Sequence, residues 1–135
     1  MFEKIIKLLN DAKNISIYSH INTDCDAMGS SLALKLALEQ LGKNVDVYSN
    51  SDFPSNFKFY SEFMDGVNKK NCEKYDLAVC LDTPNENRLG KYKFSYRKGV
   101  KNVVVIDHHY LSYPRESTHL DTWYRNELLY HNENK

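Results

Sequence analysis

The chain of 135 residues has little cysteine, proline and glycine and no net charge. With 18 basic and 18 acidic residues, it lacks the basic excess that displaces counterions from duplex nucleic acid, so we expect no general duplex binding. No run approaches the roughly 18 apolar residues of a membrane span, and the N-terminal residues form no signal-peptide core. Three cysteines without a CxxC pair are typical of a reducing compartment. The sequence therefore predicts a cytoplasmic protein.

What is present fits one globular domain, with 41% hydrophobic and 27% charged residues and no linker rich in Gly, Pro or Ser. Apolar periodicity predicts helices over residues 2–13 and 27–41, the second ending before Gly42. A short helix with aromatic packing residues is expected from Pro54. Strands are predicted over residues 15–19, 44–48, 77–81 and 103–106. Alternating strands and helices predict an α/β fold with a doubly wound, mainly parallel sheet and helices on both faces.

The last 25 residues differ in composition from the rest. Residues 111–135 contain no Ala, Val, Ile, Gly, Phe, Met or Cys. We expect a poorly specified tail there, with at most a weak helix that includes Trp123, Leu128 and Leu129. The predicted α/β domain therefore occupies residues 1–110.

Polar residues follow three of the predicted strands directly. Because the carboxyl ends of parallel strands share one edge of a sheet, we expect these residues to meet in one crevice. The seven side chains are four aspartates and three histidines: His20, Asp24, Asp26, Asp82, Asp107, His108 and His109.

Such a cluster favours a bound cation, because neighbouring carboxylates repel one another. Mixed imidazole and carboxylate ligands suit first-row metals such as Mn, Fe, Co or Zn. Seven donors exceed the needs of one tetrahedral ion, whereas two ions about 3.5–4 Å apart would suit phosphoester hydrolysis. Taken singly, each residue has another reading: His20 as a hydrogen-bonded loop residue, Asp24 and Asp26 as a turn or helix cap, and Asp82 as a turn residue.

Three further residues are candidates for contact with a substrate phosphate. Gly29 and Ser30 lie near the start of the second predicted helix, where amide groups and the helix dipole favour an anion. Arg88 follows Asp82 and could contact the phosphate as well. The alternatives are a sterically required small residue and a solvated arginine. Cys25, between two aspartates, is interpreted as structural.

The ordered motifs resemble those of the DHH phosphoesterase superfamily. HINTDCDAMGSS is similar to its first motif, Asp82 after LAVCL to its second, and VVVIDHH to the motif that names it. The resemblance covers about residues 1–110 and is greatest to the branch of nanoRNases and 3′-phosphoadenosine-5′-phosphate (pAp) phosphatases, followed by cyclic-dinucleotide phosphodiesterases. It implies a manganese-dependent, two-metal hydrolase of short oligonucleotides or pAp.

The resemblance also implies roles for single residues. His20 and Asp24 would bind one Mn²⁺, Asp26 and His108 the other, and Asp82 would bridge the two. His109 would face the substrate phosphate. Asp107 would orient a histidine from behind.

The chain departs from this family in two respects. A fourth aspartate motif downstream of DHH is missing, since the surroundings of Asp121 do not resemble it, and so is the C-terminal substrate-binding domain. We therefore expect a truncated domain of reduced activity. Two alternatives stay open: a non-catalytic metal- or nucleotide-binding module, and a pyrophosphatase-like or cyclic-dinucleotide-cleaving enzyme. A sheet edge exposed by truncation would also allow a homo-oligomer.

Overall fold

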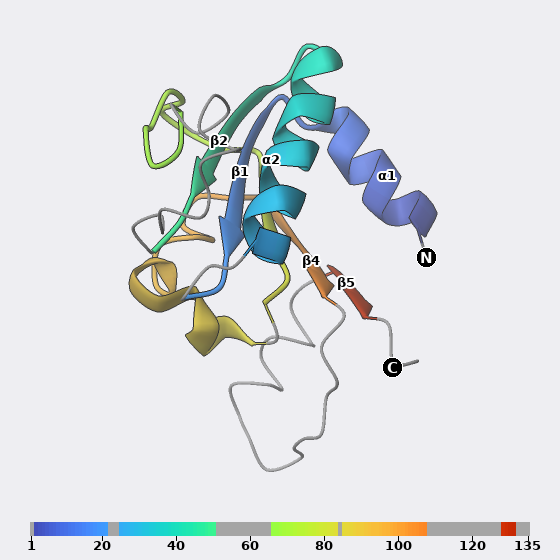
Figure 1. Cartoon of the computed structure of the whole chain (residues 1–135). Coiled ribbons are helices and arrows are strands. Elements are labelled where there is room, and N and C mark those ends of the chain that lie inside the picture. The colour runs from blue at the N-terminus through green and yellow to red at the C-terminus, as the bar shows by residue number, and fades with distance from the viewer. Residues whose placement is uncertain (1, 22–24, 51–65, 84, 108–127, 132–135) are drawn as a thin grey trace.

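The computed structural model describes residues 2–21, 25–50, 66–83, 85–107 and 128–131. Five parallel strands form one sheet in the order β2-β1-β3-β4-β5 (Figure 1). Their bounds are β1 Asn14–Ser19, β2 Asn44–Tyr48, β3 Leu77–Leu81, β4 Asn102–Asp107 and β5 Leu128–His131. The predicted α/β fold with a parallel sheet is confirmed.

The strands form where apolar and β-branched residues follow one another. All five residues of β3 are buried, as a strand covered on both faces requires. The predicted bounds of β2 and β3 are those of the structure. β1 begins one residue earlier than predicted, and β4 is longer by one residue at each end.

Two helices, α1 (Phe2–Asp11) and α2 (Cys25–Gln40), precede the second strand. α2 lies along one face of the sheet, with α1 beside it (Figure 1). Its Met28, Leu32 and Leu38 join a core that includes Ile15 and Ile17 of β1. Gly42, with φ +83°, ends α2 as predicted, and its amide donates to the carbonyl of Glu39. The helix begins two residues before the predicted start, at Cys25.

A tyrosine-rich core occupies the opposite face of the sheet. It contains Tyr18 of β1, Tyr48 of β2 and Cys80 of β3, together with Tyr96 and Leu89. Leu89 belongs to η2, a 3₁₀ segment over Glu86–Tyr92 that the sequence did not predict. Among the described residues this segment and the turns that follow it cover this face, where the sequence analysis had expected helices on both faces of the sheet without assigning one to this part of the chain.

The outer edge of β2 is covered by residues 68–75. The amide of Asn68 donates to the carbonyl of Val47 at 2.8 Å, as a neighbouring strand would. Asp46 of β2 is 1% exposed and accepts four hydrogen bonds from the same segment. These contacts hold the segment along this edge of the sheet.

The chain then returns to the centre of the sheet through Asp76. One carboxylate oxygen accepts the amides of Lys13 and Asn14, both at 2.9 Å, and thereby fixes the start of β3 beside the start of β1. These hydrogen bonds join positions 63 and 62 residues apart in the chain.

The prediction for the end of the chain was wrong at Leu128 and Leu129. They belong to the parallel strand β5, where Leu128 pairs with Val104 and Leu129 with Val105 of β4. Residues 128–131 are too few for their apolar pattern to identify a strand. They form one because the edge of β4 offers backbone groups with which they can pair. The helix predicted from Pro54 lies outside the described residues. No helix in the described part of the chain is long and apolar enough to cross a membrane.

Candidate functional site

Three of the predicted site residues, two proposed ligands and one proposed orienting aspartate, follow the carboxyl ends of β1, β3 and β4. Ser19 pairs with Leu81, and Leu81 with Ile106, so the next residues, His20, Asp82 and Asp107, follow at one level across three adjacent strands. We call these three residues the polar row. They are 7%, 7% and 5% exposed, respectively. Sheet register therefore assembles residues that are far apart in the sequence.

The row lies where the order of the strands reverses direction. β1 is followed along the chain by β2 on one side, whereas β3 lies on its other side. At such a point the connections leave the sheet in opposite directions, and a crevice forms beyond the strand ends. His20 and Asp82 follow the two strands that border it.

His20 is held by a hydrogen bond within its own loop. Its Nδ1 lies 2.5 Å from the carbonyl oxygen of Ile21, and this contact requires the hydrogen on Nδ1. In the neutral ring Nε2 then carries the lone pair, and it lies 3.5 Å from Oδ2 of Asp82. A histidine whose second nitrogen donates to a carbonyl is the arrangement found at metal ligands.

The donor geometry of this pair fits a shared metal ion. Two ligands each about 2.1 Å from one ion are separated by roughly 3.0 Å at a right angle and roughly 3.6 Å at 120°. The observed 3.5 Å lies within this range. Imidazole nitrogen together with carboxylate oxygen suits first-row divalent ions.

Asp82 adopts an unusual backbone conformation. Its φ is +55°, in the left-handed region that is uncommon for residues other than glycine. The amide of Asp82 nevertheless donates to the carbonyl of Ile106 at 2.9 Å, so the sheet ladder continues to this residue. Such conformations persist where surrounding contacts fix them, and they are concentrated at functional sites.

The predicted residues of α2 are placed differently from the polar row. Asp26 is exposed in the first turn of the helix. Because α2 begins at Cys25, Gly29 and Ser30 lie in its second turn instead of at its start. Their contact with a substrate phosphate stays a prediction.

The structure brings the backbone of Arg88 beside the loop that carries His20. The carbonyl of Arg88 accepts the amide of Ile21 at 2.7 Å. Arg88 itself is half-buried within η2. A backbone hydrogen bond thus joins Ile21, which follows His20, to Arg88, the residue predicted to contact a phosphate.

Two residues that sequence reasoning missed hold η2 in this position. Asn50, just after β2, donates from Nδ2 to the carbonyl of Leu89 at 2.7 Å and accepts the amide of Lys91 at 2.9 Å. Between these contacts, Gly90 has a φ of +58°, and a Cβ there would lie 2.4 Å from Cγ2 of Ile21. In the sequence, the glycine within NRLGKY was the only feature that could have indicated this turn.

Three predicted site residues, Asp24, His108 and His109, lie outside the described residues. Within the described ranges, no group of three or more His, Cys, Asp or Glu side chains is close enough together to hold an ion. The polar row supplies a close pair, His20 and Asp82, with Asp107 on the next strand.

Comparison with known proteins identifies the family of the chain. Residues 14–127 match the family described as "DHH family, N-terminal domain". A Mycoplasma pneumoniae protein, "Uncharacterized protein MG371 homolog", is 32% identical over 102 residues, which are 71% of this chain and 29% of that protein. The solved structure of an exopolyphosphatase-related protein from Bacteroides fragilis is similar with a TM-score of 0.70 and 26% identity, over 96% of this chain and 38% of that one. The chain thus spans about a third of the length of these relatives.

Proposed function

Because the chain belongs to the DHH family of metal-dependent phosphoesterases, we propose that its polar row forms part of a manganese site that hydrolyses phosphoesters. The proposed substrates are short oligonucleotides or pAp. The observation that carries the proposal is His20, whose Nδ1 contacts a carbonyl and whose Nε2 lies 3.5 Å from Asp82.

The proposed ligands divide between two ions. His20 and Asp24 would bind one Mn²⁺, Asp26 and His108 the other, with Asp82 between them. Bound metal would lower the pKa of a coordinated water and neutralise charge on the phosphoryl group. The donor set of nitrogen and carboxylate oxygen supports this choice of ion.

The chain's own residues would position the reacting groups. The carbonyl of Ile21 orients the His20 ring, and the sheet ladder reaching Asp82 keeps its carboxylate beside that ring. His109 would face the substrate phosphate, and Asp107 would orient a histidine. Arg88, held beside the His20 loop, would contribute positive charge near the phosphate.

Product analysis with Mn²⁺ tests the proposal. We expect mononucleotides from a dinucleotide, or AMP from pAp, and we expect Asp82→Asn to abolish this turnover because it removes a charged ligand while keeping the shape. Asp11→Asn, on the surface of α1, is the matched control and should leave turnover unchanged. Equal turnover by the Asp82 variant would overturn the proposal.

Two other activities are distinguished by the same assay. Release of phosphate from pyrophosphate or polyphosphate alone would favour the activity suggested by the name of the exopolyphosphatase-related relative. Manganese binding without turnover of any substrate would favour a non-catalytic binding module. The latter is a specific alternative because the described residues alone supply fewer than three clustered ligands.

A further inference from the structure

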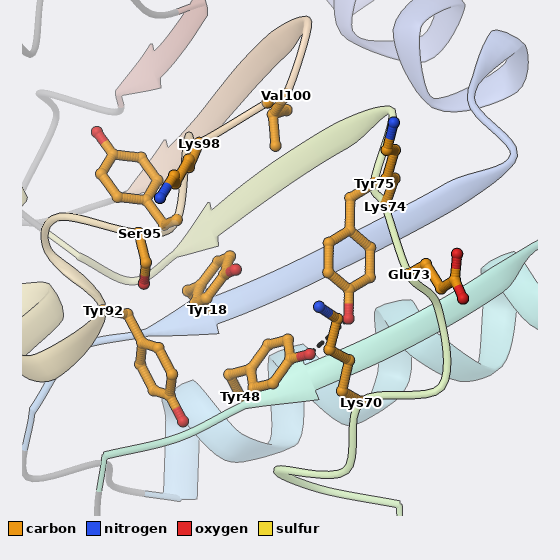
Figure 2. A pocket seen from close by; sticks show the side chains of 12 residues that line it. Tyr18, Tyr48, Lys70, Glu73, Lys74, Tyr75, Tyr92, Ser95, Lys98 and Val100 are labelled. Atoms are coloured by element: carbon orange, nitrogen blue, oxygen red, sulfur yellow. Dashed lines mark hydrogen bonds between the residues drawn. The ribbon is translucent and has the colours of Figure 1, made fainter.

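A pocket lined by tyrosines lies on the face of the sheet opposite α2. Its volume is about 490 Å³, within the range of roughly 300–1,000 Å³ that small-molecule sites occupy. Five tyrosines surround it, as Figure 2 shows for the four that are labelled. We call it the tyrosine pocket; its aromatic residues are Tyr18, Tyr48, Tyr75, Tyr92 and Tyr96.

The aromatic rings form a preassembled wall. Tyr18 and Tyr48 are stacked with their ring centres 5.3 Å apart, and Tyr92 is tilted against both at 5.4 Å. The hydroxyl of Tyr75 contacts that of Tyr48 and donates to Asp46 at 2.6 Å. These contacts fix the rings before any ligand arrives, so binding would cost little ordering entropy.

The tyrosine hydroxyls remain neutral at physiological pH. Burial raises the pKa of Tyr18 to about 12, and it also raises the pKa values of Tyr48 and Tyr92. The negative charge of nearby Asp46 is already engaged by four hydrogen bonds. Charge inside the pocket therefore depends on its rim.

The rim of the pocket is positively charged. Lys70, Lys74 and Lys98 line it together with a single acidic residue, Glu73, in a chain whose net charge is zero. All three lysines are exposed, and none forms an ion pair with another described residue. Figure 2 shows Lys70 and Lys98 on opposite sides of the tyrosines. An anionic group is the chemistry that this rim would bind.

A ligand that contacts both the aromatic wall and the lysine rim would need a planar ring and a phosphate group. Aromatic side chains stack on nucleobases in a way that tolerates any base, at about 1–3 kcal/mol per base. Lysine is a common phosphate ligand. We propose that the tyrosine pocket binds a nucleoside monophosphate, with the base against the half-buried rings of Tyr75 and Tyr92 and the phosphate at the lysine rim.

This site is separate from the polar row and needs no metal, because ammonium groups supply the charge that a metal supplies elsewhere. It does not depend on the proposed hydrolysis. The full chain is therefore titrated calorimetrically with AMP in the presence of EDTA, and with adenosine and inorganic phosphate in parallel. We expect AMP to bind at least ten times more tightly than adenosine or phosphate.

Paired variants locate the site. Lys70→Glu/Lys98→Glu should weaken AMP binding at least tenfold, whereas Lys4→Glu/Lys101→Glu, on exposed lysines outside the pocket, should not. Tyr92→Leu, which removes a half-buried ring, should weaken AMP binding while a cooperative thermal transition shows that the variant remains folded. The proposal is overturned if AMP does not bind at millimolar concentration, binds only with Mn²⁺, binds no better than phosphate, or binds the Lys70/Lys98 variant equally well.

Discussion

At the scale of single residues, the site depends on which nitrogen of His20 carries the hydrogen. The sequence predicted His20 and Asp82 as neighbours because both follow strands, and the 3.5 Å between Nε2 and Oδ2 agrees with this. It could not predict the bond from Nδ1 to Ile21, or the φ of +55° at Asp82. Both depend on how the chain turns after the strand, which apolar patterning does not determine.

Removal of the His20 ring should therefore weaken metal binding strongly. We expect His20→Ala to lower Mn²⁺ affinity at least about tenfold, because even residues behind the ligands contribute 10–100-fold. Isothermal titration with Mn²⁺ measures the change, and Asp11→Asn serves as the control. Unchanged affinity in the His20 variant would exclude this residue as a ligand.

Asp46 links stability to pH through its hydrogen bonds. Burial tends to raise the pKa of this carboxyl, but hydrogen bonds from Tyr75, Asn71 and the amide of Cys72 outweigh burial, so its pKa lies below the usual 3.8. A lowered pKa in the folded state means that its contribution is complete above pH 3.8 and is lost as the pH falls through the folded-state value.

Asp46→Asn should destabilise the chain at neutral pH by about 1–3 kcal/mol, because an amide NH₂ replaces an acceptor that faces several donors. The stability difference from the wild type should shrink as the pH falls below 3.8, because the unfolded wild-type chain then takes up a proton at this carboxyl, and it should be smallest once the folded-state carboxylate is protonated as well. Urea denaturation at neutral and acidic pH measures both effects. A difference independent of pH would contradict this linkage.

At the scale of elements, the helices and strands with long apolar patterns in their own sequence were predicted most accurately. The continuous apolar run LAVCL identified β3 to the residue, and the Leu- and Ala-rich stretch identified α2 to within two residues. η2 has no such pattern, since only Leu89 within it is buried. Its position instead depends on Asn50, more than 35 residues earlier in the chain.

Gly90 is the position at which η2 is most sensitive to substitution. Gly90→Ala would place a Cβ 2.4 Å from Ile21 and 2.6 Å from Oδ1 of Asn50, on a backbone with φ +58°. We expect a loss of about 1–3 kcal/mol in unfolding free energy and weaker Mn²⁺ binding, because the His20 loop must shift.

Gly42→Ala provides the matched control for this experiment. Gly42 also has a positive φ, +83°, but a Cβ there meets nothing within 4 Å. The Gly42→Ala variant should lose stability through backbone strain alone and should bind Mn²⁺ with the affinity of the wild type. Equal loss of metal affinity in both variants would argue against a specific contact between Gly90 and the His20 loop.

At the scale of the whole molecule, metal binding and folding are coupled. The proposed site draws on the ends of three strands, so Mn²⁺ would bind the folded chain and not the unfolded one. At a concentration one hundred times the dissociation constant, this adds about 2.7 kcal/mol and raises the melting temperature by on the order of 10 °C. Thermal melting with and without Mn²⁺ measures the shift, and none is expected for Asp82→Asn.

The pairing of β1 with β3 has a consequence for the order of folding events. Ile15 pairs with Leu77, so the central pair of the sheet closes a loop of about sixty residues, whereas β1 pairs with β2 across a shorter connection through α2. Closure of long loops delays the pairing of parallel strands. His20 and Asp82 lie at the ends of these two strands and can meet only after that closure. In a stopped-flow refolding experiment, acquisition of metal affinity would therefore follow the formation of α2 and mark the slow phase.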